Sequence, residues 1–232
     1  MAEQKAASIR ARVRAEMVDE IKRVARRHLA VDGANLSLRA VARDLGMVSS
    51  AVYRYFASRD DLLTALILDA YNALGDAAER AEAAVPRGDL LGRWLAVADG
   101  LRGWALAHPE EYALIYGSPV PGYAAPVDTV EPSTRPVVLL GGILADAWRA
   151  GLLVDHGDDP LPPALAAEVR RIAEFTGADV PEYAMVRGLL AWTELFGALS
   201  FELFGRINNT ILERDAWFAH QVRAMAAYTG LR

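Results

Sequence analysis

The sequence contains no cysteine, which excludes several classes of protein at once. Disulfides, cysteine-ligated zinc, iron–sulfur clusters and thiol catalysis all require that side chain. Lysine is almost as scarce, because Lys5 and Lys22 are the only two and neither follows a glycine. A phosphate-binding loop of the Walker type therefore cannot form. We expect no metal and no cofactor.

Long hydrophobic runs are also missing. No uninterrupted apolar stretch reaches the roughly 18 residues that a membrane-spanning helix needs, and Met1–Met17 lacks the apolar region of a signal peptide. We therefore expect a soluble cytoplasmic protein with no membrane partner. The chain of 232 residues is 53% apolar and 24% charged, so it can bury a full core and is not mainly disordered.

Charge is divided unevenly along the chain. Residues 1–60 hold 12 basic and 7 acidic residues, a net charge of +5, whereas the remainder carries −10. Such asymmetry suggests a basic N-terminal head that meets a polyanion and an acidic body that does not. A basic helical face is more often simply solvated, so the charge division needs a motif beside it.

Apolar residues recur at helical spacing almost throughout, which predicts an all-α protein. Three N-terminal stripes run over 9–29, 38–45 and 62–74, and Ser58 is the expected N-cap of the third, with Asp61 three residues on. The segment Ser118–Thr134 contains four prolines and is predicted to be a long loop or flap without regular helix. Residues 155–163 form a second expected loop. Further helices are expected near 88–107, 109–117, 135–150, 164–176, 181–205 and 213–229.

The most informative stretch is Leu36–Leu63, which predicts a helix-turn-helix. Ser37 can cap a short helix over 38–45, and Gly46 supplies the left-handed turn that other residues resist. A second short helix is expected from Ser49 to Tyr55. In a helix-turn-helix the second helix enters the major groove of DNA.

This stretch resembles the head of the TetR/AcrR type of bacterial regulators. That family usually has T-x-x-x-I-A-x-x-x-G-V-S followed by Y-x-Y-F-x-[ST]-[KR]-[DE]-x-L. The matching residues here are Ser37, Val41, Ala42, Gly46, Tyr53, Tyr55, Phe56, Ser58, Arg59, Asp60 and Leu62. The segment from Tyr53 to Leu63 is a specific match, and the resemblance implies an N-terminal DNA-binding domain.

The resemblance also implies which side chains meet DNA. Arg59 matches a residue that clamps a phosphate at a helix start. Val48 stands where the family has Ser or Thr, so the N-cap of the second helix has either moved to Ser49 or been lost. Tyr53 and Tyr55 have the alternative role of packing residues with solvated hydroxyls. The predicted DNA-binding residues are Ser37, Arg39, Ser49, Ser50, Ala51, Tyr53, Tyr55 and Arg59.

A second subunit is predicted from the helix over Tyr183–Phe204, which is apolar on all sides. A helix of that kind must be covered all round, and a chain this small lacks enough other helices to do so. The last helix would complete a four-helix interface between two copies. The resemblance agrees, since TetR-like proteins dimerise through their last two long helices. The alternative is a central core helix in a monomer.

A small-molecule site is predicted in the middle of the chain. The segment Arg102–Tyr123 resembles the WHG type of C-terminal domain that accompanies some TetR-like heads. Apolar and aromatic side chains beside the proline-rich segment suit a small lipophilic or aromatic effector. The candidate ligand-binding residues are Trp104, Tyr112, Ile115, Tyr116, Trp148, Trp192 and Phe196.

Other polar residues give weaker signals. Glu194 lies inside the apolar helix, either in the pocket or at the subunit boundary paired with an arginine. The four histidines are widely separated, and His156 beside Asp158 and Asp159 is at most a weak metal site. No set of residues forms a catalytic constellation, so we expect no enzyme.

The predicted protein is a homodimeric transcriptional regulator, most simply a repressor. Residues 1–60 would form the DNA-binding domain, and residues 61–232 would bind the effector and form the dimer. Each dimer would bind a palindromic operator and leave it when the effector binds. Two alternatives remain: a DNA-binding regulator or activator without a ligand, and a helical enzyme with a helix-turn-helix-like hairpin.

Overall fold

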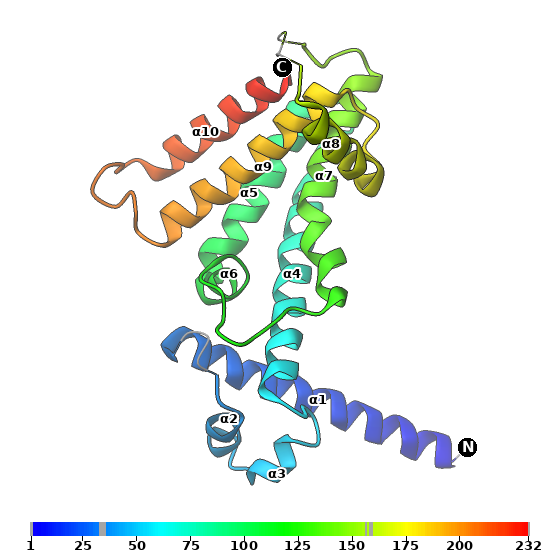
Figure 1. Cartoon of the computed structure of the whole chain (residues 1–232). Helices are drawn as coiled ribbons and strands as arrows, with labels where there is room; N and C mark the ends of the chain where they lie inside the picture. The colour runs from blue at the N-terminus through cyan, green and yellow to red at the C-terminus, as the bar shows by residue number, and fades with distance from the viewer. Residues whose placement is uncertain (1, 33–35, 156, 158–159, 232) are drawn as a thin grey trace. The chain divides into compact units, whose positions relative to one another are not determined.

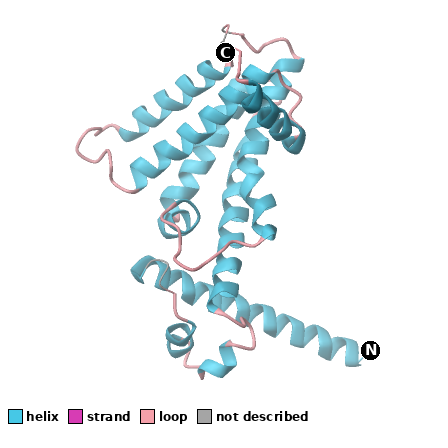
Figure 2. Ribbon diagram, viewed as in Figure 1, coloured by secondary structure: helices cyan, strands magenta, loops and turns pink. Residues whose placement is uncertain are grey.

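The computed structural model describes residues 2–32, 36–155, 157 and 160–231, and every regular element in this part of the chain is a helix (Figure 2). The all-α prediction is therefore confirmed. The elements, labelled in Figure 1, are α1 (Ala2–Asp32), α2 (Leu38–Asp44), α3 (Ser49–Val52), α4 (Arg59–Ala83), α5 (Leu90–Ala107), α6 (Pro109–Tyr116), a 3-10 turn (Val127–Thr129), α7 (Val130–Arg149), α8 (Pro163–Thr176), α9 (Glu182–Leu203) and α10 (Arg214–Thr229).

The predicted start of α7 is wrong, because this helix begins at Val130, inside the segment expected to be free of regular helix. Pro132 falls in the first turn, where a missing amide hydrogen costs nothing. Pro136 lies further along and is buried inside the helix. The hydroxyl of Ser133 donates to the Val130 carbonyl oxygen at 2.7 Å, and that of Thr134 donates to the Glu131 carbonyl oxygen. Helix therefore continues across two prolines.

The chain forms two compact units, which we call the N-terminal unit (Met1–Tyr71 and His108–Thr129) and the C-terminal unit (Asn72–Ala107 and Val130–Arg232). The division falls within α4. It also assigns α6 and the proline-rich segment after it to the N-terminal unit, although they lie between helices of the C-terminal unit in the sequence.

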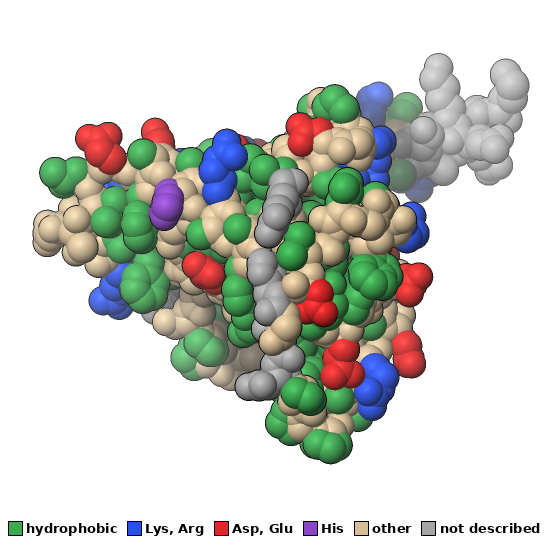
Figure 3. Space-filling model, turned by 90° about the horizontal axis from the view of Figure 1, so that it is seen from above, with side chains coloured by type: hydrophobic (Ala, Val, Ile, Leu, Met, Phe, Trp, Pro, Cys, Tyr) green, Lys and Arg blue, Asp and Glu red, His purple; other side chains and the backbone are tan. Residues whose placement is uncertain are grey.

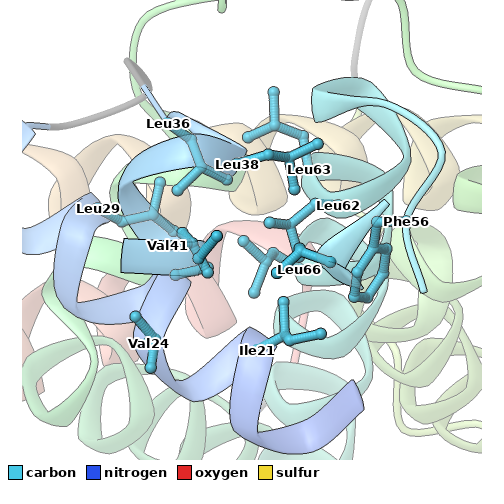
Figure 4. Packing of buried hydrophobic residues seen from close by; sticks show 13 residues of the cluster. Ile21, Val24, Leu29, Leu36, Leu38, Val41, Phe56, Leu62, Leu63 and Leu66 are labelled. Atoms are coloured by element: carbon cyan, nitrogen blue, oxygen red, sulfur yellow. The ribbon is translucent and has the colours of Figure 1, made fainter. Parts of the chain in front are cut away.

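The N-terminal unit has one apolar core, to which α1, α2, α3 and the first turns of α4 all contribute (Figure 4). These residues point toward one another from each helix, and none is more than 7% exposed. The core consists of Ile21, Val24, Ala25, Leu29, Leu36, Leu38, Val41, Ala42, Val52, Phe56, Leu62, Leu63 and Leu66. The inner parts of the three predicted stripes therefore converge on this cluster, whereas Ile9 and Val13 of the first stripe are exposed.

The segment of α6 and the following loop is held in this unit by polar contacts. The Arg26 guanidinium donates to Asp69 of α4 at 2.7 Å and to Glu111 of α6 at 2.8 Å. The hydroxyls of Thr64 and Tyr123 lie 2.9 Å apart. The proline-rich segment is therefore tied to the N-terminal unit at a defined point.

The C-terminal unit contains a buried network of charges. Arg93 of α5 is 2% exposed, and its Nε donates to Glu82 of α4 at 2.6 Å. Its Nη1 donates to Asp146 of α7 at 2.7 Å. Burial alone would raise the pKa of the Asp146 carboxyl, but the hydrogen bond from Arg93 and the nearby charges of Arg149 and Arg87 hold that pKa below its usual value. The network joins three helices.

A second charged clamp joins α4 and α7 in this unit. The Arg135 guanidinium donates to Glu79 and Asp76, and also to the Asn72 carbonyl oxygen at 3.1 Å. It lies directly against Gly75, where an added Cβ would come within 2.7 Å of the Arg135 Nε. Glycine at this position gives the guanidinium its place on the helix.

The surface of the C-terminal unit carries many hydrophobic side chains (Figure 3). Helices α9 and α10 pack side by side (Figure 1). On α9, Leu190 and Phe201 are exposed, and on α10 so are Trp217 and Tyr228. Among the described helices, none is both long and apolar enough to cross a membrane.

Candidate nucleic-acid interface

The predicted helix-turn-helix is formed by α2 and α3. The Ala40 amide donates to the Ser37 hydroxyl at 3.4 Å, so Ser37 caps α2 as expected. Gly46 has φ of +65°, and nothing lies within 4 Å of where its Cβ would be. The backbone angle of the turn, not lack of space, therefore favours glycine at this position. The Met47 amide closes the turn on the Ala42 carbonyl oxygen at 2.9 Å.

Helix α3 is shorter than predicted, since it ends at Val52 and not at Tyr55. The residues after it form turns that close on α3 itself, with the Phe56 amide donating to the Val52 carbonyl oxygen at 3.1 Å. Val48 is the N-cap, and within the described part of the chain no side chain caps the first turn. Of the two alternatives, the cap has been lost and has not moved to Ser49. The Ser49 hydroxyl is therefore not used as a cap.

The predicted contact residues differ in exposure. Arg39, Ser50 and Tyr53 are exposed, whereas Ser49 is half-buried. Ala51 is 7% exposed and faces the core, which leaves its side chain little surface to offer a base. The tip of the helix-turn-helix is therefore formed mainly by the exposed members of the set.

Tyr55 packs against the core and is covered by an arginine from another helix. Its ring borders the apolar cluster, and the Arg14 guanidinium carbon lies 5.1 Å from the ring centroid. Arg14 Nη2 also donates to the Arg54 carbonyl oxygen at 3.2 Å. This geometry agrees with the packing alternative for Tyr55. Reasoning from the sequence missed Arg14, because its partners lie about 40 residues away and no local spacing signals them.

Arg59 begins α4 and is held in place by its own chain. Its Nε donates to the Leu36 carbonyl oxygen at 3.1 Å, and its Nη1 lies 3.4 Å from an Asp60 carboxylate oxygen. Just before it, the Ser58 hydroxyl accepts from the Asp61 amide while Asp61 accepts from the Ser58 amide, both at 3.0 Å. This reciprocal cap was predicted and is confirmed.

The seven candidate ligand residues divide between the two units. Tyr112 is fully buried in the N-terminal unit, with its ring centroid 5.1 Å from that of Tyr116. Burial raises the pKa of the Tyr116 hydroxyl, and the neighbouring Tyr71 and Tyr112 add to the rise. The Ile115 carbonyl oxygen accepts from the Tyr71 hydroxyl at 3.5 Å.

The other four lie in the C-terminal unit. Trp104 and Phe196 are buried, and the Trp192 ring meets Phe196 edge-on with centroids 6.0 Å apart. Trp148 is 44% exposed. The residues expected to form a pocket are therefore a mixture of core and surface.

An enclosed apolar cavity does lie between α7, α8 and α9, but its volume is only about 20 Å³. That space holds about one water molecule, whereas ligand pockets commonly measure roughly 300–1,000 Å³. None of the seven predicted ligand residues is among the described residues that line it. The lining comprises Val137, Leu140, Gly141, Leu144, Ile172, Thr176, Val180, Met185, Gly188 and Leu189.

Glu194 is exposed and lies in an open groove along α9 and α10. Gly197, Phe201 and Trp217 line the same groove. Glu194, Gly197 and Phe201 follow Leu190 at helical spacing, so all four share one face of α9. The Glu194 carboxylate therefore lies among apolar residues on one exposed face of α9.

No group of three or more potential metal ligands occurs among the described residues. The His28 Nε2 lies 2.8 Å from an Asp44 carboxylate oxygen, which links α1 to α2. The suggested site of His156, Asp158 and Asp159 lies outside the described residues.

Comparison with protein families gives two matches. Residues 21–66 match the model described as bacterial regulatory proteins of the tetR family. Residues 94–225 match the model described as a tetracyclin repressor-like C-terminal domain. HTH-type transcriptional regulators of Mycobacterium tuberculosis and Mycobacterium bovis are 39% identical over 220 residues, which is 92% of this chain and 92% of each relative.

Solved structures show the same fold. The structure described as a possible regulatory protein, SCO4313, superposes with a TM-score of 0.77 at 33% identity, covering 94% of this chain and 98% of that one. The TetR family regulator PfmR of Thermus thermophilus gives a TM-score of 0.60 at 14% identity, covering 88% and 96%.

Proposed function

The chain belongs to the TetR family of bacterial transcriptional regulators, which bind DNA and are not enzymes, and from this membership we propose a repressor that binds a palindromic operator as a homodimer. A small lipophilic or aromatic effector would release it. Because its target is chromosomal DNA, it would work in the compartment that holds the chromosome, the bacterial cytoplasm.

The observation that carries the proposal is the exposed edge of α2 and α3 beside a fixed arginine. Arg39 and Ser50 stand free of the core, where they could reach base edges in the major groove. Arg59 is oriented by the Leu36 carbonyl, which suits a phosphate contact at the start of α4. We assign sequence preference to Arg39 and Ser50, and general affinity to Arg59.

The paired surface of α9 and α10 supports the dimer. Leu190, Glu194, Gly197 and Phe201 share one face of α9, and on α10 Trp217 and Tyr228 lie three turns apart on one face. Two apolar stripes on adjacent helices give a self-complementary surface for a two-fold interface. A palindromic operator requires two such heads. In the dimer Glu194 would lie at the boundary.

Effector control rests on differential affinity. A ligand that binds the DNA-incompetent state more tightly shifts the population toward that state. The cavity of about 20 Å³ would have to widen to take such a ligand, by displacement of α8 or its neighbours. The likeness of Arg102–Tyr123 to the WHG type stays a prediction.

The alternative function is a regulator or activator that needs no ligand. The cavity of about 20 Å³ is too small for an effector in this conformation, which favours this alternative. A thermal-shift screen with lipophilic compounds separates the two. An effector that binds the folded state raises the unfolding midpoint by mass action. A screen with no hits would favour the ligand-free regulator.

The DNA-binding role is tested by fluorescence anisotropy, using a site recovered by in vitro selection with the full chain and a random duplex. Arg59→Ala should weaken binding to both roughly tenfold and reduce the dependence on salt by about one unit per contact. Arg59→Lys keeps the charge and should retain most of the affinity. Arg39→Ala should instead reduce the preference for the selected site.

The matched control is Arg80→Ala, which removes an arginine with a side chain 72% exposed on the C-terminal part of α4. It should leave both affinities unchanged. If Arg59→Ala behaves like Arg80→Ala, Arg59 is not a phosphate contact. If the unaltered chain selects no duplex at all, the proposed function is wrong.

A further inference from the structure

Helix α1 extends well beyond the core of the N-terminal unit (Figure 1). Ile9 and Val13 are 46% and 50% exposed, and the first buried residue that the structure describes on this helix is Ile21. We call the segment 9–16 the α1 extension. The matched family model begins at residue 21, so this segment lies outside the part of the head that the family defines.

The intrinsic helix propensity of its residues favours a helical α1 extension. Its residues are mostly Arg, Ala and Glu, which are strong helix formers. Arg12 and Glu16 form an ion pair at 3.6 Å with side chains 72% and 67% exposed. A pair this open contributes little and leaves the arginine available to a stronger anion. The segment therefore forms a helix by local propensity, and its arginine side chains lie on an exposed surface.

The charge of the α1 extension is of one sign along its first turns. Arg10, Arg12 and Arg14 are all exposed, and no acidic residue occurs between 9 and 15. Arg10 and Arg14 are four residues apart and so lie on the same face of the helix. That face is basic over a full turn.

The same face of α1 contacts the residues that directly follow α3. Arg14 donates to the Arg54 carbonyl oxygen at 3.2 Å and covers the ring of Tyr55, just after α3. Arg10 lies one turn further out on the same face, and Arg54 is itself exposed. The basic face is therefore continuous with the end of the helix-turn-helix.

We propose that the α1 extension is a second DNA contact, which binds phosphates of the duplex flanking the groove that α3 enters. The inference rests on the proposed DNA-binding function. From Arg10 to Ile21 the helix rises roughly 16 Å at about 1.5 Å per residue, which corresponds to about five base pairs. Each half-site would therefore be protected further outward than the helix-turn-helix alone can reach.

A duplex fits this surface better than an apolar partner does. Ile9 and Val13 are exposed on a neighbouring face, but they are isolated aliphatic side chains. The arginines are continuous with other exposed arginines near α3, and repeated anions are what such a row complements. An anionic membrane is the rival partner, and the experiment distinguishes it.

The test uses the full chain with Arg10→Ala and Arg12→Ala combined, substitutions that raise helix propensity and leave Arg14 in place. Binding is measured by anisotropy on two duplexes that carry the same selected site, one with ten extra flanking base pairs on each side and one trimmed to the site. The double variant should lose about tenfold in affinity for the long duplex and less than about twofold for the short one. Its salt dependence on the long duplex should fall by about one unit, because Arg10 lies on the proposed DNA face and Arg12, two residues on, does not share that face.

Two control proteins accompany it. Arg10→Lys with Arg12→Lys keeps the charge and should bind the long duplex nearly as well as the unaltered chain. Arg171→Ala removes an arginine with a side chain 75% exposed, paired with Glu168 on α8, and should have no effect on either duplex.

The outcomes are distinguishable. If the unaltered chain binds the selected site and the double variant binds long and short duplexes equally well, the second contact is wrong and the proposed function stands. If the double variant loses binding only to phosphatidylglycerol vesicles, the partner is a membrane and the inference is overturned. If the unaltered chain binds no duplex, the proposed function fails together with it.

Discussion

The two units of this chain complete their cores in different ways. In the N-terminal unit, parts of α1, α2, α3 and α4 contribute to one cluster whose residues are at most 7% exposed. In the C-terminal unit, α9 and α10 bury one side of each helix and leave Leu190, Phe201, Trp217 and Tyr228 exposed. An exposed apolar face of this size is typical of a surface that binds a partner, and the proposed dimer depends on it.

The units also use charge differently. In the N-terminal unit the interhelical ion pairs, such as Arg26 with Asp69, are partly open to solvent. In the C-terminal unit Arg93 is enclosed and depends on Glu82 and Asp146 for its compensation. Because the Arg93 charge is removed from solvent, the stability of the C-terminal unit should depend strongly on each of its carboxylate partners.

The largest expected effect is a loss of self-association when the exposed face of α9 and α10 is altered. Phe201→Glu should weaken self-association by roughly a thousandfold, about 4 kcal/mol, because it places a charge at the centre of the proposed interface in both copies. Sedimentation equilibrium measures the dissociation constant. Phe201 is 57% exposed in the single chain, so the fold of each subunit should be unaffected.

The matched control is Phe175→Glu on α8, where the phenylalanine is 63% exposed. It should leave self-association unchanged. Equal loss of association in both variants would show that exposed aromatic area in general, and not the α9–α10 face, holds the dimer together.

The next effect is a loss of stability, which should be larger when a buried ion-pair partner is removed than when an exposed one is. Glu82→Ala should lower the free energy of unfolding by about 3 kcal/mol, because it leaves part of the Arg93 charge buried without compensation. Arg87→Ala removes a solvent-exposed partner of the same carboxylate and should cost less than about 1 kcal/mol. Urea denaturation followed by circular dichroism gives both values. Equal losses would mean that burial does not set the importance of this network.

The smallest effect concerns the N-cap of α4 in the N-terminal unit. Ser58→Ala should cost about 1 kcal/mol, because the Asp61 amide loses its cap at the start of α4. Hydrogen exchange of the first turn of α4 should quicken, while the core of the C-terminal unit should exchange as before. Unchanged exchange at Asp61 would show that the cap contributes nothing.

Much of the fold could be predicted because it depends on spacing along the chain. The stripe that contains Ile21 and Leu29, the cap at Ser58 and the turn at Gly46 are all local features, and the structure shows each of them. The start of α7 could not be predicted from the proline content alone, because the first turn of a helix accepts proline. The end of α3 was missed because the turns after Val52 continue the same local spacing.

What could not be predicted are contacts between distant residues. The pairing of Arg93 with Glu82 and Asp146 leaves no local signature, and neither does the Arg14 contact with Arg54. Candidate ligand residues were chosen by type, yet apolar side chains serve cores and pockets alike, and Tyr112 and Trp148 have opposite exposures. The position of Ala51 on the inner side of α3 also depends on the packing of the whole head.

The contact between Arg135 and Gly75 limits the order in which these two positions can mutate. While the guanidinium occupies the space beside Gly75, where Asp76 and Glu79 hold it, even a methyl group there requires it to shift. Alanine is otherwise the better helix former by about 1 kcal/mol. An evolving lineage would therefore meet a barrier if Gly75 changed first, and a downhill step once Arg135 had been replaced.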